Sequence, residues 1–419
     1  MDLRSSDPEI FDLIKQEEER QCHTLNLIAS ENYASPATLE IQASILANKL
    51  AEGFIGRREC AGCEIIDKIE KLAIERIKIL FKADHANVQA PTATQANLAV
   101  YSALLRPGDV VLAPKLSHGG HFSHGSQRHI SGKIYRFLHY GVSRETEQVE
   151  IDAVEEMAVE CRPKLIIAGM SAYPRKIVFS KFRNIADKVG AYLLADMAHI
   201  SGLVIAGLHP DPVPYADVVT SSTHKTLRGP RGGGVILCRK EYAEAIDQAV
   251  FPGTQGAPLM NIIASRAVLF KEAMSPKFKE YQNQVVTNAR VLAEALASNG
   301  IRLVTGGTDT HMILIDLRPQ GLEGKEAEDM LYSVGIATNK NLIPFDEKPP
   351  GVTSGLRLGV AALTTRGMKE REMTDIGRLI SEALLNSKQK GVLEEIGEET
   401  RSIAKEFSLF SSEWNIESE

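Results

Sequence analysis

The sequence has few aromatic residues, few cysteines and no excess of positive charge. Aromatic residues make up 6% of the 419 residues, with one tryptophan, and the five cysteines are Cys22, Cys60, Cys63, Cys161 and Cys238. A small, odd number of cysteines argues against a disulfide framework, so we expect a reducing, cytoplasmic compartment. The net charge of −6, from 48 basic and 54 acidic residues, makes nucleic acid an improbable partner.

Long hydrophobic runs are also missing. No stretch approaches about 18 uninterrupted apolar residues, so we expect no membrane-spanning helix and no membrane partner. The N-terminal stretch has no basic segment followed by an apolar one, and we expect no secretory signal there. With 43% hydrophobic and 24% charged residues, the composition is typical of a globular enzyme, and the length suggests two or three domains.

Short apolar runs alternate with helical patterns through the middle of the chain. The predicted strands are ANVQA, VVLA, KLIIAGM, AYLLAD, VVTSST and GGVILC, and the helices between them include TQANLAVYSALL and FRNIADKVG. Strands that alternate with helices in this way favour a mostly parallel sheet covered on both faces. The predicted fold class is therefore α/β.

The pattern changes past Phe251, which suggests a second domain. A long amphipathic pattern over 277–297 is followed by HMILIDL, a helix over about 323–334, the strand GLRLGVAAL and a helix over about 367–385. We therefore expect a smaller α+β domain after a large one. The expected segments are an N-terminal helical arm at 1–25, a large domain at 26–270, a small domain at 271–385, and a polar tail at 386–419 with a helical stretch and Trp414.

Two residues at predicted strand ends suggest cofactor chemistry. Asp196 ends the strand AYLLAD, and Lys225 follows the apolar run VVTSS. Each alone has an ordinary explanation, because Asp196 can cap a turn and Lys225 can be a solvated surface charge. Together they suit pyridoxal phosphate, which needs a lysine for a Schiff base and an acid that keeps the pyridine nitrogen protonated.

A phosphate site is predicted at Thr92-Ala93-Thr94, between the strand ANVQA and a helix beginning near Gln95. Free N–H groups and the helix dipole favour an anion at such a position. Thr94 can also be simply the N-cap of the helix, and the two roles are compatible. The glycines at 232–234 either allow a close backbone approach or form a tight turn.

Histidines and cysteines elsewhere give weaker signals. His118, His121 and His124 recur every third residue, but the glycines among them predict a loop and not a zinc motif, so we expect no metal. A histidine stacked on an aromatic cofactor fits better. Cys60 and Cys63 have C-x-x-C spacing without a second pair or a thioredoxin-like context, and chance is the better interpretation.

Arg357, in TSGLRLG, is a candidate for binding a substrate carboxylate through two hydrogen bonds. Surface arginines are commoner than functional ones. Taken alone, Arg357 therefore remains a weak indication.

The motifs taken together resemble those of serine hydroxymethyltransferases. They are LIASEN, NVQ…TQAN, LSHGGHFSHGS, SAYP, DMAHISGL, SSTHKTLRGPRGG, FPGTQGAPLM, TNKN and TSGLRLG, in the order of that family from about residue 10 to residue 385. The resemblance implies the fold-type I pyridoxal-phosphate architecture, with an aspartate-aminotransferase-like large domain and a small domain. It also implies a homodimer with active sites at the subunit interface.

The resemblance further implies roles for single residues. For catalysis and the cofactor ring it implies Lys225 as the Schiff-base lysine, Asp196 at the pyridine nitrogen, His121 stacked on the ring, and His199 and Ser171 beside the ring oxygen. For the phosphate it implies Thr92, Ala93, Thr94, His224 and the partner's Gly256. For the substrate it implies Ser30 and Arg357 at the carboxylate and Glu52 as the acid–base at the hydroxyl or folate, while Arg231 matches the arginine of GPRGG.

The sequence departs from the family pattern in the segment 48–63. Leu50 stands where the family has a tyrosine that reaches the partner's phosphate, and Glu59 and Cys60 replace an adjacent pair of tyrosines. One of that pair packs on folate in the family, and the other lies beside the substrate carboxylate. Leu50 and Cys60 are therefore expected in the substrate pocket, with more room than tyrosines leave.

The expected reaction makes or breaks the Cα–Cβ bond of a β-hydroxy amino acid, with pyridoxal phosphate as cofactor. Tetrahydrofolate is the expected acceptor for a hydroxymethyltransferase, although the lost aromatic platform and Glu59 disfavour folate binding. The alternative is a folate-independent threonine transaldolase or aldolase, or a hydroxymethyltransferase acting on a non-standard amino acid. Transamination, decarboxylation and a scaffold without catalysis also remain open.

Overall fold

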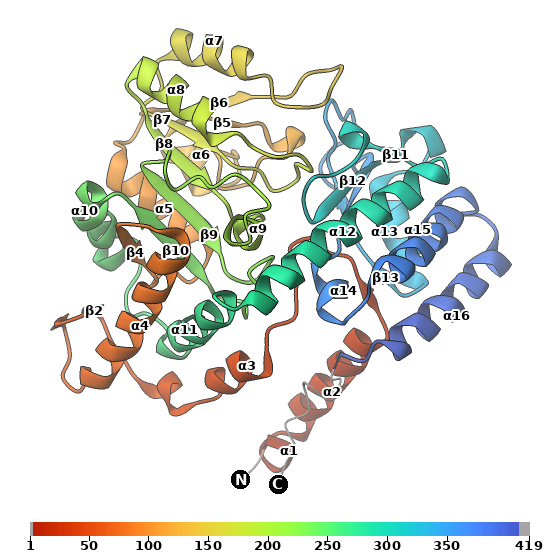
Figure 1. Ribbon diagram of the computed structural model, residues 1–419, viewed down its shortest axis with the longest axis horizontal. Coiled ribbons are helices and arrows are strands. Elements are labelled where there is room, and N and C mark those ends of the chain that lie inside the picture. Colours follow the sequence, from red (N-terminus) through yellow and green to blue (C-terminus); the bar gives the residue numbers. More distant parts are fainter. Residues whose placement is uncertain (1–2, 410–419) are drawn as a thin grey trace.

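A computed structural model describes residues 3–409, and a seven-stranded sheet forms its centre (Figure 1). The strand order is β4-β10-β9-β8-β7-β5-β6. The five neighbouring strands β6, β5, β7, β8 and β9 pair in parallel. The strand β10 is antiparallel to both of its neighbours, β9 and β4. The strands are β4 (His85–Asn87), β5 (Val110–Pro114), β6 (Arg136–Tyr140), β7 (Leu165–Ala168), β8 (Tyr192–Asp196), β9 (Val218–Ser222) and β10 (Gly234–Cys238).

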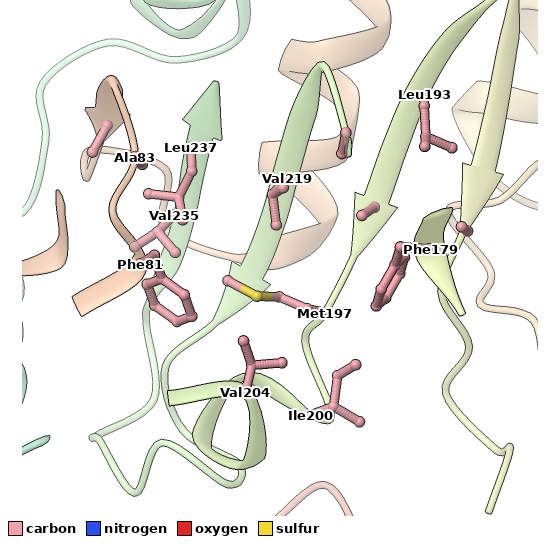
Figure 2. Packing of buried hydrophobic residues seen from close by; sticks show 14 of the residues in the cluster. Phe81, Ala83, Phe179, Leu193, Met197, Ile200, Val204, Val219, Val235 and Leu237 are labelled. Atoms are coloured by element: carbon pink, nitrogen blue, oxygen red, sulfur yellow. The ribbon is translucent and has the colours of Figure 1, made fainter. Parts of the chain in front are cut away.

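Helices cover both faces of this sheet, which explains why its strands β5, β7 and β10 are apolar almost throughout. Alternate residues of one strand enter two different cores, so Val219 packs on one face and Val218 on the other. Figure 2 shows the first core, where Met197 and Ile200 lie between the sheet and the short helix α9. The helices around the sheet are α4 (Glu64–Phe81), α5 (Ala93–Leu104), α6 (Ile130–Ile134), α7 (Ile151–Cys161), α8 (Phe179–Val189), α9 (Ser201–Ile205), α10 (Ala243–Gln248) and α11 (Met260–Ala273).

A second, antiparallel sheet of four strands lies beside the first, with the order β11-β12-β15-β14. Its strands are β11 (Arg302–Leu303), β12 (Met312–Asp316), β14 (Asn339–Asn341) and β15 (Gly355–Gly359), and its helices are α12 (Pro276–Ser298), α13 (Gly324–Ser333), α14 (Ala361–Thr365), α15 (Glu370–Leu385) and α16 (Lys390–Glu406). Ile396 and Ala404 of α16 are buried in the same core. The strand β1 (Leu25–Asn26) joins it by pairing with β13 (Ile336–Ala337), so this core draws on both ends of the described chain.

The N-terminal helices project from the body of the molecule (Figure 1). They are α1 (Leu3–Ser6) and α2 (Pro8–Cys22), and α2 buries none of its residues. The helix α3 (Pro36–Gln42) follows, and then a hairpin of β2 (Gly53–Phe54) and β3 (Arg57–Arg58). No helix among residues 3–409 combines the length and the apolar character needed to cross a membrane.

The α/β fold predicted from the sequence is confirmed, but two strand predictions were too long. The strand expected over ANVQA ends at Asn87, because the Asn87 side chain accepts a hydrogen bond from the Gln89 N–H and turns the chain. The strand expected over GLRLGVAAL ends at Gly359, where a Cβ would lie 2.4 Å from the Cα of Ala29, and α14 follows. Trp414 lies outside the described residues.

Candidate active site

A cavity of about 570 Å³ opens at the C-terminal ends of the central strands and extends to β14 and β15. Ligands of open α/β sheets bind at this edge. Most of the residues singled out in the sequence line this cavity. They are Ser30, Thr92, Ala93, Thr94, His121, Ser171, Asp196, His199, His224, Lys225, Arg231 and Arg357.

Asp196 is held as a buried carboxylate at the end of β8. Its Oδ2 accepts hydrogen bonds from Asn97 at 3.0 Å and from the His124 ring at 3.1 Å, and Oδ1 accepts one from the Ala198 N–H. Burial alone would raise the pKa of Asp196, but the hydrogen bonds and charge of His124 outweigh it and hold the pKa well below its ordinary value. The cavity therefore contains a permanent negative charge.

Lys225 lies just beyond β9 and faces the same space. Burial lowers the pKa of Lys225 to about 8; Asp196 acts in the opposite direction, and Arg357 and Arg231 add to the lowering. About a tenth of the amine is therefore neutral at pH 7, far more than for an ordinary lysine. A neutral amine is what a lysine needs to attack a carbonyl group.

Three histidines around the cavity are kept neutral. Burial is the main cause and lowers the pKa of His121 to about 4 and that of His224 to about 3. Burial likewise holds the pKa of His199 well below its ordinary value. The His199 ring stacks on that of His311, with centroids 5.5 Å apart. These side chains offer ring faces and neutral nitrogens to a ligand.

The first turn of α5 forms one end of the cavity. Thr92, and not Thr94, is the N-cap, because its side chain accepts a hydrogen bond from the Gln95 N–H at 3.1 Å. The N–H groups at the start of a helix have no partner within it, so they are available to an anion. Gly234 permits the close packing behind this turn, since a Cβ there would lie 2.2 Å from the Thr92 carbonyl oxygen.

Arg357 forms the other end of the cavity. It is 9% exposed, and it donates hydrogen bonds to the Ser171 carbonyl at 2.7 Å and to the Asn339 side chain at 3.3 Å. Both of these partners are uncharged, and burial lowers the pKa of Arg357 to about 10. A buried guanidinium with neutral partners and a free side toward a cavity is suited to an incoming carboxylate.

Sequence reasoning missed three residues that organise this site. Asn97 and His124 hold the Asp196 carboxylate, as described above. Arg266 is fully buried and donates hydrogen bonds to the carbonyls of Val88, Ala90, Gly232 and Gly234. It thereby joins the segment between β4 and Thr92 with the glycine-rich segment after Lys225. An arginine inside the apolar stretch NIIASRAVLF was the available signal.

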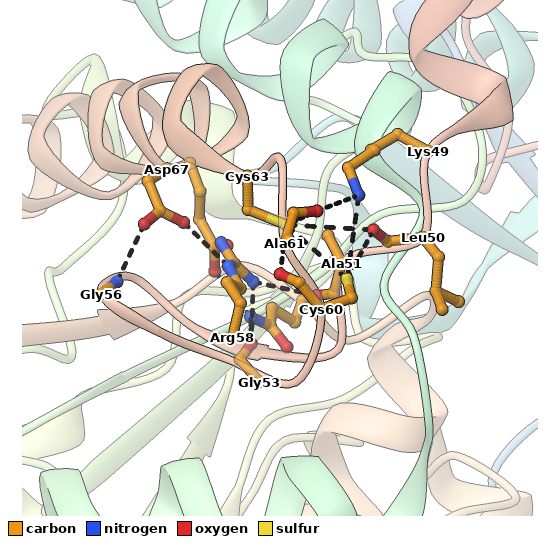
Figure 3. Close-up of polar contacts among 12 residues, drawn as sticks. Lys49, Leu50, Ala51, Gly53, Gly56, Arg58, Cys60, Ala61, Cys63 and Asp67 are labelled. Carbon is orange, nitrogen blue, oxygen red and sulfur yellow. Dashed lines mark hydrogen bonds and ion pairs between the residues drawn. The ribbon is translucent and has the colours of Figure 1, made fainter.

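Four of the predicted site residues do not line this cavity of their own chain. They are Leu50, Glu52, Cys60 and Gly256, which gather around the β2–β3 hairpin (Figure 3 shows Leu50 and Cys60). A Cβ at Gly256 would lie 3.2 Å from the Glu52 carboxylate. Gln89 links the neighbours of these two residues, because its side chain donates a hydrogen bond to the Gly53 carbonyl and its backbone carbonyl accepts one from the Gln255 side chain.

The three histidines with regular spacing do not converge on one point. His124 donates to Asp196, the His121 ring contacts the Ser123 hydroxyl, and His118 accepts a hydrogen bond from the Val142 N–H. Within residues 3–409, no group of three or more histidine, cysteine or acidic side chains is arranged to hold a metal ion. The repeat reflects three separate contacts of one loop.

Comparison with known proteins points to one family. Residues 3–380 match the family model described as serine hydroxymethyltransferase. A serine hydroxymethyltransferase of Myxococcus xanthus is 53% identical over 410 residues, covering 98% of both chains. Another, from Coprothermobacter proteolyticus, is 56% identical over 388 residues and 93% of both chains.

Proposed function

Because this chain belongs to the serine hydroxymethyltransferase family, whose members are pyridoxal-phosphate enzymes of fold type I, we propose that it transfers a hydroxymethyl group between serine and tetrahydrofolate. The observation that carries the proposal is the cavity itself. It contains a lysine with a lowered pKa and an ionised aspartate, and it has an anion-binding group at each end. The comparisons favour none of the alternative reactions.

The residues of the cavity fit pyridoxal phosphate. The cofactor has a phosphate, an aromatic ring with a basic nitrogen, and an aldehyde, and the cavity offers a counterpart to each. Thr92, Ala93 and Thr94 would hold the phosphate at the start of α5, with His224 beside them. The Nδ1 atom of His224 is buried and has no hydrogen-bond partner within residues 3–409, as expected for a group that awaits a ligand.

We assign the remaining cofactor contacts as follows. Asp196 would hold a proton on the ring nitrogen, His121 would lie on the face of the ring, and Ser171 and His199 would flank the ring oxygen. Lys225 would bind the cofactor covalently and release it to the amino group of the substrate. When bound, pyridoxal phosphate supplies an electron sink for the pair of electrons left at the substrate α-carbon.

Substrate binding is assigned to groups at the far end of the cavity. Arg357 and Ser30 would hold the amino-acid carboxylate, which fixes the bonds of the α-carbon relative to the ring. Glu52 would exchange the proton of the β-hydroxyl group. Leu50 and Cys60 would leave more room beside the substrate than the tyrosines of the family.

We propose that two chains build each site. Glu52 does not line the cavity of its own chain, so its assigned role requires the cavity of a partner. An exposed apolar stripe supports a homodimer, because Ile65, Leu72 and Ile79 recur on one face of α4 and are 62%, 44% and 67% exposed. A face of this kind is expected to be covered by protein.

The small number of cysteines supports our proposal that the enzyme works in the reducing cytoplasm.

Catalysis is tested by following serine conversion to glycine with and without tetrahydrofolate. We expect turnover that depends on folate, on pyridoxal phosphate and on Lys225. After borohydride reduction, peptide mapping should find the cofactor attached to Lys225. Full activity in Lys225→Ala, or turnover indifferent to folate, would contradict the proposal.

Subunit complementation tests the shared site. Lys225→Ala and Glu52→Ala are each expected to be inactive, but a mixed dimer has one site with both residues intact. Random exchange should therefore restore about a quarter of the wild-type sites. If Glu52 acted in its own chain, mixing the two variants would restore no activity. Light scattering serves as the control, because it shows whether dimers have formed.

A further inference from the structure

Two cysteine thiols lie in contact beside a lysine, outside the cavity (Figure 3). The sulfur atoms of Cys60 and Cys63 are 3.7 Å apart. The Lys49 ammonium is 3.8 Å from the Cys60 sulfur and donates a hydrogen bond to the Ala61 carbonyl at 3.1 Å. Cys60 is partly exposed, and Cys63 is buried at 5% exposure. A thiol reagent in solution would therefore react with Cys60 before Cys63.

The two thiols also contact the segment that leads to Glu52. The Cys60 thiol donates to the Leu50 carbonyl at 3.2 Å, while the Cys63 thiol lies 3.4 Å from the Cys60 carbonyl and 4.0 Å from the Leu50 carbonyl oxygen. Cys63 is the N-cap residue of α4, but its side chain makes no capping hydrogen bond. The pair is therefore free to change its bonding without breaking a helix cap.

We propose that Cys60 and Cys63 are a thiol–disulfide modification site that controls the position of Leu50, beside the segment that carries Glu52. The oxidant is a low-molecular-weight disulfide. The Cys60 thiolate attacks one sulfur of that disulfide, forming a mixed disulfide and releasing one thiol. Cys63 then attacks the Cys60 sulfur and releases the second thiol, so two protein thiols are oxidised while one small disulfide is reduced.

Lys49 assists the first step. Its ammonium already donates to the Cys60 sulfur, and a thiolate accepts such a hydrogen bond better than a thiol does. Lys49 is tethered at the same time by the Ala61 carbonyl between the two cysteines. Its charge is thus fixed beside the sulfur that attacks.

Closing the disulfide must disturb the Leu50 carbonyl. The sulfurs have to approach from 3.7 Å to about 2.0 Å, and Cys60 loses the proton that it donates to this oxygen. The backbone on either side of Glu52 resists movement, because Arg58 binds the carbonyls of Ala51 and Gly53 and ion-pairs with Glu70. The displacement is therefore concentrated at Lys49 and Leu50, next to the segment that carries Glu52.

The cross-link is tested on the full-length holoenzyme in buffers of reduced and oxidised glutathione. After alkylation, peptide mass spectrometry should find a Cys60–Cys63 disulfide that dithiothreitol reverses. Cys63→Ser should stop at a mixed disulfide on Cys60 and should fold, since serine is a favoured N-cap. The matched control Cys161→Ser should form the cross-link as the wild type does. Lys49→Met should slow the first step by about fivefold or more.

The effect on turnover rests on the proposed role of Leu50 and Glu52 at the substrate, whereas the cross-link does not. We expect oxidation to lower kcat/KM by about fivefold or more in the wild type, and we expect Cys60→Ser, which cannot begin the exchange, to keep the kcat/KM of its own reduced form. Two outcomes would overturn the proposal: both thiols staying free in oxidised glutathione, or a complete cross-link with unchanged turnover. Failure of the proposed function would instead show as no turnover in the reduced enzyme, with the cross-link still forming.

Discussion

The cavity around Lys225 and the hairpin around Glu52 are built in different ways. In the cavity, the charged groups Asp196, Lys225 and Arg357 are each about 9% exposed and lie on, or just beyond, strands of a single chain. In the hairpin, the buried charges hold the backbone, while Leu50 remains 54% exposed. One chain thus provides the cofactor-binding half of the proposed site. The half that contacts the substrate is the hairpin, which has to lie against the cavity of a second chain.

The largest effect is expected from Asp196→Asn. Asparagine has the same shape and can still accept hydrogen bonds from Asn97 and His124, but it has no charge to hold a proton on the ring nitrogen. We expect kcat to fall on the order of 10³-fold while the cofactor stays bound. Steady-state kinetics with cofactor content measured on the same sample test this. A loss below about tenfold would remove Asp196 from the assigned role.

A smaller effect is expected from Arg357→Ala, at the opposite end of the cavity. A hydrogen bond to a charged group contributes about 1.5–3 kcal/mol, so KM for serine should rise by roughly 10- to 100-fold. The change should appear in KM more than in kcat. Arg231→Ala is the control, because Arg231 lines the same cavity but is exposed, and we expect a weaker effect on KM. Equal effects of the two substitutions would argue against a specific carboxylate site.

The pH dependence of cofactor attachment should follow Lys225. Its pKa in the folded apoprotein is about 8, against an ordinary value of 10.5, so the neutral amine increases as the pH rises toward 8. The rate of reconstitution with pyridoxal phosphate should rise about tenfold per pH unit below that pH and level off above it. Stopped-flow absorbance measures this rate.

Two further measurements test what lowers the pKa of Lys225. The charge of Arg357 contributes to the lowered pKa of Lys225, so Arg357→Ala should move the midpoint to higher pH. Because the unfolded chain binds the proton up to pH 10.5, this group should also make the apoprotein more stable as the pH rises from about 8 to 10.5. A midpoint unmoved in Arg357→Ala would contradict this account of the cavity.

The sequence was sufficient to predict the residues that depend on local order along the chain. Asp196, Lys225 and Thr92 follow apolar runs, and the ends of neighbouring strands meet at one edge of the sheet. Contacts between segments far apart in the chain could not be predicted from the sequence. The pairing of 25–26 with 336–337 and the four carbonyls bound by Arg266 depend on tertiary packing, which no local pattern encodes.

The smallest effect is expected in the hairpin, from Leu50→Tyr. Leu50 is exposed in one chain, so a larger side chain does not disturb the core of its own chain. If a partner's cavity lies next to it, the added phenol can donate one hydrogen bond to the charged cofactor phosphate. Such a bond contributes roughly 1.5–3 kcal/mol, and ordering an exposed side chain offsets about 1 kcal/mol or more of it, which leaves about 0.5–1.5 kcal/mol. The dissociation constant of pyridoxal phosphate should then fall by about two- to tenfold.

Leu50→Phe is the matched control, because it adds the ring without the hydroxyl group and should leave the cofactor affinity near that of the wild type. Equilibrium titration of the apoprotein compares the three chains. An equal gain in both variants would mean that packing, and not the phosphate, responds to residue 50. No gain in either would separate the hairpin from the cofactor and restrict its influence to the substrate, which would weaken the argument that one site is shared by two chains.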